Sequence, residues 1–441
     1  MAKGDKGKES HKAIPTSRVG RFARVARMAS GVAGGMLAEG TRQIRAGKRP
    51  KARDMLLTPG NARRVADQLA TMRGAAMKVG QILSMDTGDF LPRELADILA
   101  RLRSDARYMP PGQLHQVMSE AYGEEWESVF YGFEHKPLAA ASIGQVHKAM
   151  SPDGQEIVLK VQYPGVATSI DSDVDNIASL LKLSGLLPGE LDIQPLLDDA
   201  KAQLHDEADY NKEAEFLAAF GDLLQGDDRF IVPQVLPELT RKTVLAMSYV
   251  NGRPIENIAT ESQEVRDQVM TALVELMFRE LFELRMVQTD PNFANYQYNS
   301  ASGKIVLLDF GATRRFKASF VNAYRSLAKA AIAGNEKRLA AAAEKVGYAM
   351  GDEDSEYRAL VLELFMLALE PLQTDEDYDF ARSTMAARMS ELSEEVTRFT
   401  DFWQVPPTEA VFFHRKLGGM FMLASRLKAR VNVHRLIKQF L

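Results

Sequence analysis

The 441-residue sequence contains no cysteine, which excludes disulfide bonds and thiolate metal sites. It also contains no signal-peptide pattern and no apolar run of the roughly 18 to 20 residues that a membrane-spanning helix needs. We therefore expect a cytoplasmic protein. Hydrophobic residues make up 46% and charged residues 26% of the chain, which is typical of a globular protein with a sizeable core.

Aromatic and acidic residues are scarce in the first 60 positions, where Phe22 is the only aromatic residue and 14 Lys and Arg face four Asp and Glu. We predict a disordered basic tail over residues 1–17. From residue 18 the arginines alternate with apolar residues, as in a basic amphipathic helix that contacts anionic membrane lipids. The alternative is a helix that packs on its own domain with solvated arginines. Because aromatic residues are nearly missing, we expect no nucleic-acid partner. The arginines are Arg18, Arg21, Arg24 and Arg27.

The most informative motif lies within residues 287–315. Asp290 is followed by Asn295 and, after the apolar run 305–308, by Asp309-Phe-Gly. Each piece alone could be an ordinary turn, but this order matches the base-like carboxylate and two Mg²⁺ ligands of protein kinases. Mg²⁺ prefers oxygen ligands and is usually held by one or two protein side chains. We predict Asn295 and Asp309 as metal ligands and Asp290 as the catalytic residue that orients or deprotonates an acceptor.

A kinase-like site also needs a strand lysine and a helix glutamate. Lys160 lies in the strand-like segment 158–162, where a kinase lysine would pair with the phosphates of ATP. Its partner would be Glu213, within the helical run 196–224. The alternatives are a lysine on an edge strand that reaches solvent and a solvated surface glutamate, and the choice of Glu213 depends on the motif. We predict catalytic roles for both residues.

The glycine-rich turn of protein kinases is missing. In its place stand Ala139, Ala140, Ala141 and Ser142, followed by Gly144. Alanine disfavours the positive φ values that glycine allows, so we predict a more rigid nucleotide-binding loop that holds ATP differently.

Features that serve peptide substrates are missing as well. Pro291 and Asn292 stand where a protein kinase places a lysine, and Gln288 and Thr289 replace the usual His-Arg. No Ala-Pro-Glu follows Asp309. The sequence therefore argues against the machinery that docks a peptide.

Taken together, these motifs resemble the UbiB/AarF (ADCK-type) family of atypical kinases, in particular its ubiquinone-biosynthesis branch. The resemblance covers most of the chain. It implies that Lys78 and Gln81 lie on a helix that faces the nucleotide and contacts Glu207 and Asp209, which makes all four regulatory residues. It also implies ATP binding and ATPase activity in support of ubiquinone assembly. The motifs are Lys78-Val-Gly-Gln81, the loop 139–142, Glu207-Ala-Asp209, Gln288-Thr-Asp290 and Asp309-Phe-Gly311.

We therefore expect an α+β, protein-kinase-like two-lobe fold with a helical N-terminal extension. The expected boundaries are a tail over 1–17, the extension over 18–103, a small lobe over 104–250 and a helical large lobe over 251–441. The expected function is that of an ATP- and Mg²⁺-dependent atypical kinase or ATPase in ubiquinone biosynthesis. It would be peripheral to the inner membrane, with ubiquinone-pathway enzymes or precursors as partners. Two alternatives remain, a nucleotide-gated scaffold without catalysis and a phosphotransferase acting on an isoprenoid or phenolic alcohol.

Overall fold

The computed structural model describes residue 75 and residues 108–441, apart from 184–193, 349, 353–354, 397 and 400–406. The chain divides into two compact units, which we call the first and the second unit. The first unit comprises Met1–Glu215 and Gln234–Tyr249, and the second comprises Phe216–Pro233 and Val250–Leu441. The predicted tail and N-terminal extension lie outside the described residues, except for the buried helical residue Ala75.

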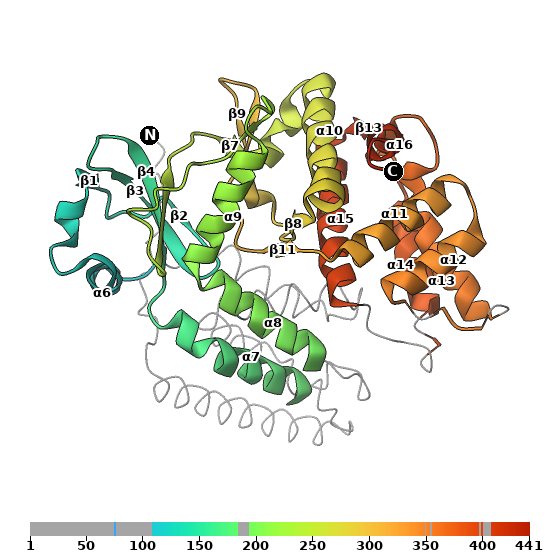
Figure 1. Ribbon diagram of the computed structural model, residues 1–441, viewed down its shortest axis with the longest axis horizontal. Coiled ribbons are helices and arrows are strands. Elements are labelled where there is room, and N and C mark those ends of the chain that lie inside the picture. Colours follow the sequence, from blue (N-terminus) through green and yellow to red (C-terminus); the bar gives the residue numbers. More distant parts are fainter. Residues whose placement is uncertain are drawn as a thin grey trace, which may run out of the picture. The chain divides into compact units, whose positions relative to one another are not determined.

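The first unit contains an antiparallel sheet in the order β1-β3-β4-β6, with β2 paired to β3 (Figure 1). Buried and half-buried residues alternate along most of β3, and every residue of β4 after Glu156 is buried. The expected strand 158–162 is therefore confirmed as the inner part of β4. The strands are β1 (Gly132–Phe133), β2 (Ala139–Ala140), β3 (Gly144–Met150), β4 (Glu156–Gln162) and β6 (Val244–Ser248).

Helix α6 (Pro111–Tyr122) covers part of this sheet. Proline suits the first turn of a helix, because its missing N–H would have no partner there. Three residues at helical spacing, Leu114, Val117 and Met118, enter the same hydrophobic core as Trp126 of the short helix η2 (Trp126–Val129). The sequence period of α6 thus sets which face is buried against the strands.

A buried series of hydrogen bonds connects the segment before α6 to the sheet. The side chain of Gln145 accepts a hydrogen bond from the Met109 backbone N–H (2.8 Å) and lies 2.7 Å from His147 Nε2. His147 Nδ1 lies 2.8 Å from the Glu134 carbonyl oxygen. The carbonyl can only accept, so Nδ1 carries the proton and Nε2 accepts from the Gln145 amide. Burial lowers the pKa of His147 and favours this neutral form.

Three further helices lie in the described part of the first unit. Helices α7 and α8 lie side by side (Figure 1), and His205 Nε2 of α8 is 3.0 Å from Asp171 Oδ1 of α7. The sequence predicted one helical run over 196–224, but the structure has two helices with a break at Ala208 and Asp209. That expectation was wrong, and the break has a local cause described below. The helices are α7 (Val166–Leu183), α8 (Gln194–Glu207) and α9 (Tyr210–Leu223), of which the last continues into the second unit.

In the second unit, two small sheets flank the chain segment 289–295. One sheet has the order β5-β10-β9-β7, in which only the β10–β5 pair is parallel. The other pairs β11 with β8. The strands of these sheets are β5 (Phe230–Ile231), β7 (Arg253–Pro254), β8 (Met286–Gln288), β9 (Tyr296–Asn299), β10 (Lys304–Leu307) and β11 (Thr313–Arg315). Elsewhere in the unit, β12 (Tyr378–Asp379) pairs with β13 (Arg430–Val431).

The rest of the second unit is mainly helical, with α11 packed on α12 and α13 on α14 (Figure 1). Among the described residues, no helix combines the length and the apolarity needed to cross a bilayer. The α-helices are α10 (Gln263–Arg279), α11 (Ala318–Ile332), α12 (Glu336–Val346), α13 (Glu356–Ala368), α14 (Met385–Val396), α15 (Thr408–Leu427) and α16 (Val433–Lys438). Short helical turns are η3 (Ile255–Thr260), η4 (Glu280–Leu284), η5 (Phe293–Asn295) and η6 (Glu370–Leu372).

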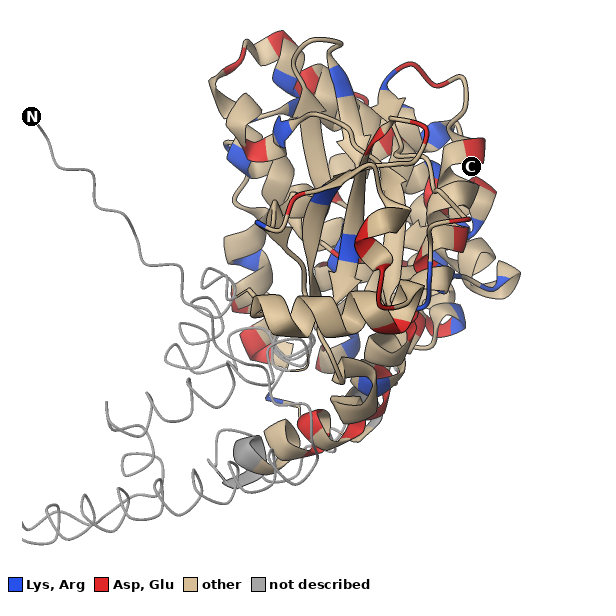
Figure 2. Cartoon of the chain, turned by 90° about the vertical axis from the view of Figure 1, so that its left-hand side faces the viewer, with Lys and Arg blue, Asp and Glu red and all other residues tan. Residues whose placement is uncertain are grey.

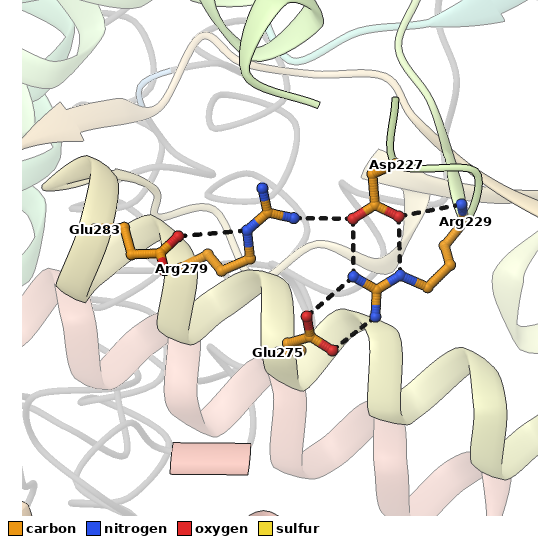
Figure 3. A network of polar contacts seen from close by, with 5 residues as sticks. All are labelled: Asp227, Arg229, Glu275, Arg279 and Glu283. Carbon is orange, nitrogen blue, oxygen red and sulfur yellow. Dashed lines mark hydrogen bonds and ion pairs between the residues drawn. The ribbon is translucent and has the colours of Figure 1, made fainter. Parts of the chain in front are cut away.

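Charged side chains of both signs are interspersed over the described helices (Figure 2). One network of them fastens the segment after α9 to α10 (Figure 3). Arg229 donates to both carboxylate oxygens of Asp227 (2.9 and 2.8 Å) and to both of Glu275 (2.6 and 3.0 Å). Arg279 donates to Asp227 (2.8 Å) and lies 3.6 Å from Glu283. The hydrogen bonds from Arg229 lower the pKa of Asp227 to about 2.

We expect Asp227→Asn to destabilise the protein by about 2 kcal/mol, because hydrogen bonds to charged groups contribute more than neutral ones. Urea unfolding measures this loss. The matched control is Asp228→Asn, since the Asp228 side chain is 96% exposed and, among the described residues, forms an ion pair only with Lys304 at 3.3 Å. Such an exposed pair contributes little. Equal unfolding midpoints for the two variants would contradict a stabilising role for the network.

Candidate active site

The first unit contributes a buried ion pair. Lys160 Nζ lies 2.7 and 2.9 Å from the two carboxylate oxygens of Glu213, and the two side chains are only 8% and 2% exposed. Lys160 lies on β4, which has neighbouring strands on both sides, so the alternative of a solvated lysine on an edge strand does not hold. A charge removed from water needs an opposite charge at hydrogen-bonding distance. The expected pairing of Lys160 with Glu213 is therefore the arrangement found.

Tyr210, in the first turn of α9, packs against this pair. Its ring centroid is 5.3 Å from Lys160 Nζ. Gly144 lies close by, because a Cβ atom added there would be 2.9 Å from Tyr210 Oη and 2.4 Å from the Val161 carbonyl oxygen. Only glycine fits this contact, so the one glycine that remains near the alanine loop is required by packing. The sequence offered no signal for Tyr210.

The loop Ala139–Ser142 forms a tight hairpin with β3. Ala139 is opposite Val146, Ala140 is opposite Gln145, and the Ala141 N–H donates to the Gly144 carbonyl (2.9 Å). Alanine is compatible with this extended pairing. The loop 139–142 directly precedes β3 and β4, as a phosphate-covering loop would. Its predicted contact with nucleotide stays a prediction.

Glu207 and Asp209 lie at the break between α8 and α9. Glu207 is buried, and Asp209 Oδ1 accepts from the Asn211 backbone N–H (3.1 Å). Asp209 thus caps the start of α9, which explains the break that helical periodicity did not reveal. The turn is further fixed by Gln162 of β4, whose amide donates to the Ala208 carbonyl (3.0 Å). The predicted contact of Glu207 and Asp209 with Lys78 and Gln81 cannot be followed, since those two residues lie outside the described part of the chain.

The second unit holds the predicted catalytic loop, residues 288–296. Asn295 Nδ2 donates to Asp290 Oδ2 (3.1 Å). Asp290 Oδ1 is shielded from solvent and has no hydrogen-bond partner among the residues that the structure describes. A shielded carboxylate oxygen without a partner is costly in a purely structural role. In a kinase-like site it is the atom that would accept a proton from, or orient, an acceptor hydroxyl.

The two predicted metal ligands come from adjacent segments. The Leu308 N–H donates to the Asn295 carbonyl (3.0 Å), which places the end of β10, and Asp309 directly after it, next to Asn295. The Asn295 amide nitrogen faces Asp290, which leaves its amide oxygen available to a cation. Asp309 Oδ1 accepts from the Gly311 N–H (3.0 Å). Phe310 packs against Phe220 with ring centroids 4.6 Å apart and the ring planes tilted by 40°.

These oxygen donors fit a hard cation such as magnesium. Within the described ranges, no cluster of three or more His, Asp or Glu side chains could hold a metal ion. One amide oxygen and one carboxylate are the number and kind of protein ligands that Mg²⁺ takes when phosphates and water complete its coordination.

Thr289 is a residue whose role the sequence did not reveal. It is fully buried, and both its backbone N–H (3.2 Å) and its hydroxyl (2.7 Å) donate to the Ala312 carbonyl. The residue before Asp290 is thereby fixed to the segment after Asp309-Phe-Gly311. A threonine in a Gln-Thr-Asp sequence gives no local sign of so distant a partner.

The comparisons with known proteins agree with this geometry. Residues 101–343 match the model of the ABC1 atypical kinase-like domain. The chain is 38% identical over 421 residues to atypical kinase COQ8B, mitochondrial, of Danio rerio, covering 95% of this chain and 67% of that protein. It is 36% identical over 433 residues to atypical kinase COQ8, mitochondrial, of Saccharomyces cerevisiae, covering 97% and 85%.

A solved structure is similar as well. The Mycobacterium tuberculosis protein Rv3197, in complex with erythromycin, is 26% identical with a TM-score of 0.60, over 86% of this chain and 96% of that one. The chain therefore belongs to the ABC1 (UbiB/AarF) family of atypical kinases, as its motifs predicted. The expected α+β, kinase-like fold and the expected class of enzyme, one that uses ATP for phosphoryl transfer, are confirmed with it.

We expect Glu213→Gln and Lys160→Met each to destabilise the protein by about 3 to 5 kcal/mol, because each leaves a buried charge without its partner. Replacing both with Met and Leu should cost less than the sum, since no charge then stays buried. A double-mutant cycle from urea unfolding curves measures the difference. Additive losses would show that the pair is not coupled.

Proposed function

We propose that the protein binds Mg-ATP and transfers or hydrolyses its γ-phosphoryl group, with Asp290 as the catalytic carboxylate. The observation that carries this proposal is the state of Asp290. One carboxylate oxygen is held by Asn295, and the other is shielded and has no partner in the described part of the chain. A side chain fixed in this way is ready to orient an acceptor hydroxyl or to take its proton.

The other predicted residues would supply binding and orientation. Lys160, held by Glu213, would contact the α- and β-phosphates, and the loop Ala139–Ser142 would cover them. Asn295 and Asp309 would hold Mg²⁺, which bridges phosphate oxygens and offsets the charge that develops during transfer. Lys78, Gln81, Glu207 and Asp209 would regulate access to the nucleotide.

The segment after Asp309 favours an acceptor other than a docked peptide. Only residues 312–317 separate Gly311 from α11, which begins at Ala318, and half of them form β11 against β8. A protein kinase uses a longer stretch there to position its peptide substrate. Water or a small hydroxyl compound is the acceptor that this short segment supports.

We further propose that this activity serves ubiquinone biosynthesis at the inner membrane, with pathway enzymes or precursors as partners. The relatives named COQ8 support the pathway. The membrane contact depends on the basic segment 18–38, which lies outside the described residues, and it therefore remains a prediction from the sequence alone.

We expect Asp290→Asn to lower the rate of phosphate release from ATP by about 10²- to 10⁴-fold while nucleotide binding persists, because a general base acts mainly in the transition state. Asp309→Asn should instead abolish the extra thermal stabilisation that Mg²⁺ adds to bound nucleotide. Asp228→Asn is the control for both assays. Wild-type phosphate release by Asp290→Asn would favour the nucleotide-gated scaffold, and wild-type Mg²⁺ stabilisation of Asp309→Asn would overturn the metal assignment.

The membrane contact can be measured by sedimentation with cardiolipin-containing liposomes. Binding should weaken between 0.1 and 1 M salt, as the Debye length falls from about 10 Å to about 3 Å. It should also weaken when Arg21, Arg24 and Arg27 are replaced together by Gln. If the triple variant and the wild type sediment equally at low salt, the segment does not dock on membranes.

A further inference from the structure

Helix α15 carries a lysine that is removed from water. Lys416 is 2% exposed and is surrounded on its helix by the buried side chains Phe412, Phe413 and Met420. Burial lowers the pKa of Lys416, but Glu280 and Tyr296 together outweigh this effect and raise the pKa above its usual range. Lys416 is therefore a buried cation, and its contacts show what the charge holds in place.

Lys416 has one partner on each side of the catalytic loop. Its Nζ lies 3.1 Å from Glu280 Oε2, and it donates to Tyr296 Oη at 3.0 Å. Tyr296, which directly follows Asn295, is 4% exposed. Glu280 begins the turn η4, which leads to β8, and the last residue of β8, Gln288, begins the loop. The ammonium group thus joins the element that leads into the loop to residue 296 at the end of the loop.

The same face of α15 contacts the loop at a third point. Gly419 is three residues beyond Lys416 and so lies on the same side of the helix. A Cβ atom added to Gly419 would be 2.5 Å from Pro291 Cβ and 3.0 Å from Pro291 Cα. The backbone of α15 therefore lies directly against the residue that follows Asp290, and no larger side chain fits between them.

From these contacts we propose that Lys416 is a positioning residue for phosphoryl transfer. It fixes the two ends of the catalytic loop, so that Asp290 and Asn295 keep the geometry that their chemistry needs. Lys416 is too buried to contact a nucleotide, and its effect passes through Tyr296 and Glu280. The inference rests on the proposed function, because the value of this geometry depends on Asp290 and Asn295 acting on Mg-ATP.

The sharpest test is Tyr296→Phe, which removes one hydroxyl and leaves Lys416 paired with Glu280. Tyr298→Phe, two residues further along β9, is the matched control. We expect Tyr296→Phe to lower kcat for phosphate release by about ten-fold, since small displacements of reacting groups have large effects on rate. KM for Mg-ATP should change little, whereas more Mg²⁺ should be needed for half-maximal rate, because Asn295 is the adjacent residue. Tyr298→Phe should retain the wild-type kcat.

Variants of Lys416 extend the test. Lys416→Met leaves the Glu280 carboxylate buried alone, and this variant could fail to fold. Lys416→Met combined with Glu280→Leu removes both charges and should fold, yet show the same loss of kcat. Lys416→Arg keeps the charge and should recover part of the rate. A structural role alone would lower the melting temperature and leave kcat unchanged at temperatures well below melting.

Hydrogen exchange gives a readout that does not depend on activity. The amides of Thr289 and Asn295 are bonded to the carbonyls of Ala312 and Asn292, and they should exchange faster in Tyr296→Phe than in Tyr298→Phe. If the wild type shows no phosphate release, or Asp290→Asn retains it, the proposed function fails while this exchange still reports on loop positioning. Wild-type exchange together with wild-type kcat in Tyr296→Phe and in the folded double variant would overturn the role of Lys416.

Discussion

The cost of removing a lysine from water is the constraint on which the site depends. Lys160 lies on the inner strand β4 and is 8% exposed, and its charge is stabilised there by Glu213 of α9, which reaches it with both oxygens. This requirement fixes α9 against β4. Tyr210, one turn earlier, fills the space beside the pair, and Gly144 leaves room for its hydroxyl. The packing of the first unit around β4 is thereby coupled to the group that would meet the phosphates.

The second unit obeys the same constraint with a different pair. Lys416 and Glu280 are as inaccessible as Glu213, and Tyr296 Oη accepts a hydrogen bond from the ammonium group. Here the lysine does not face a ligand, since its partners lie on both sides of the catalytic loop. In the proposed function, the buried cation of the first unit would contact the phosphates, whereas that of the second unit would only fix the geometry of the loop. Because each pair is shielded from salt and water, both geometries should be rigid.

The motif residues, including the distant Lys160–Glu213 pair, were predictable from sequence, whereas the contacts made by residues outside the motifs were not. Asp290, Asn295 and Asp309 lie within one short stretch, and the expected strand around Lys160 is the inner part of β4. The helix break at Asp209 was missed because helical periodicity continues across it, whereas the cause is a cap and a hydrogen bond from distant Gln162. Lys78, Gln81 and the basic segment stay predictions.

Lys416 shows why such residues escape sequence reasoning. It lies 136 positions after Glu280 and 120 after Tyr296, and a lysine within an apolar helix is more often one whose charge reaches solvent. Nothing in the order of residues distinguishes the two cases, because the difference lies in which surface the helix meets. The one local sign is Gly419, whose lack of a side chain permits contact with Pro291.

Thr289 indicates how the active geometry is maintained. In protein kinases, the arginine before the catalytic aspartate pairs with the phosphate group of a phosphorylated activation loop. In this chain the residue before Asp290 is a threonine that already bonds the Ala312 carbonyl through two donors. The connection between the catalytic loop and the segment after Asp309 needs no added charge. Residues 312–317 then lead directly into α11, so this connection is part of the fold.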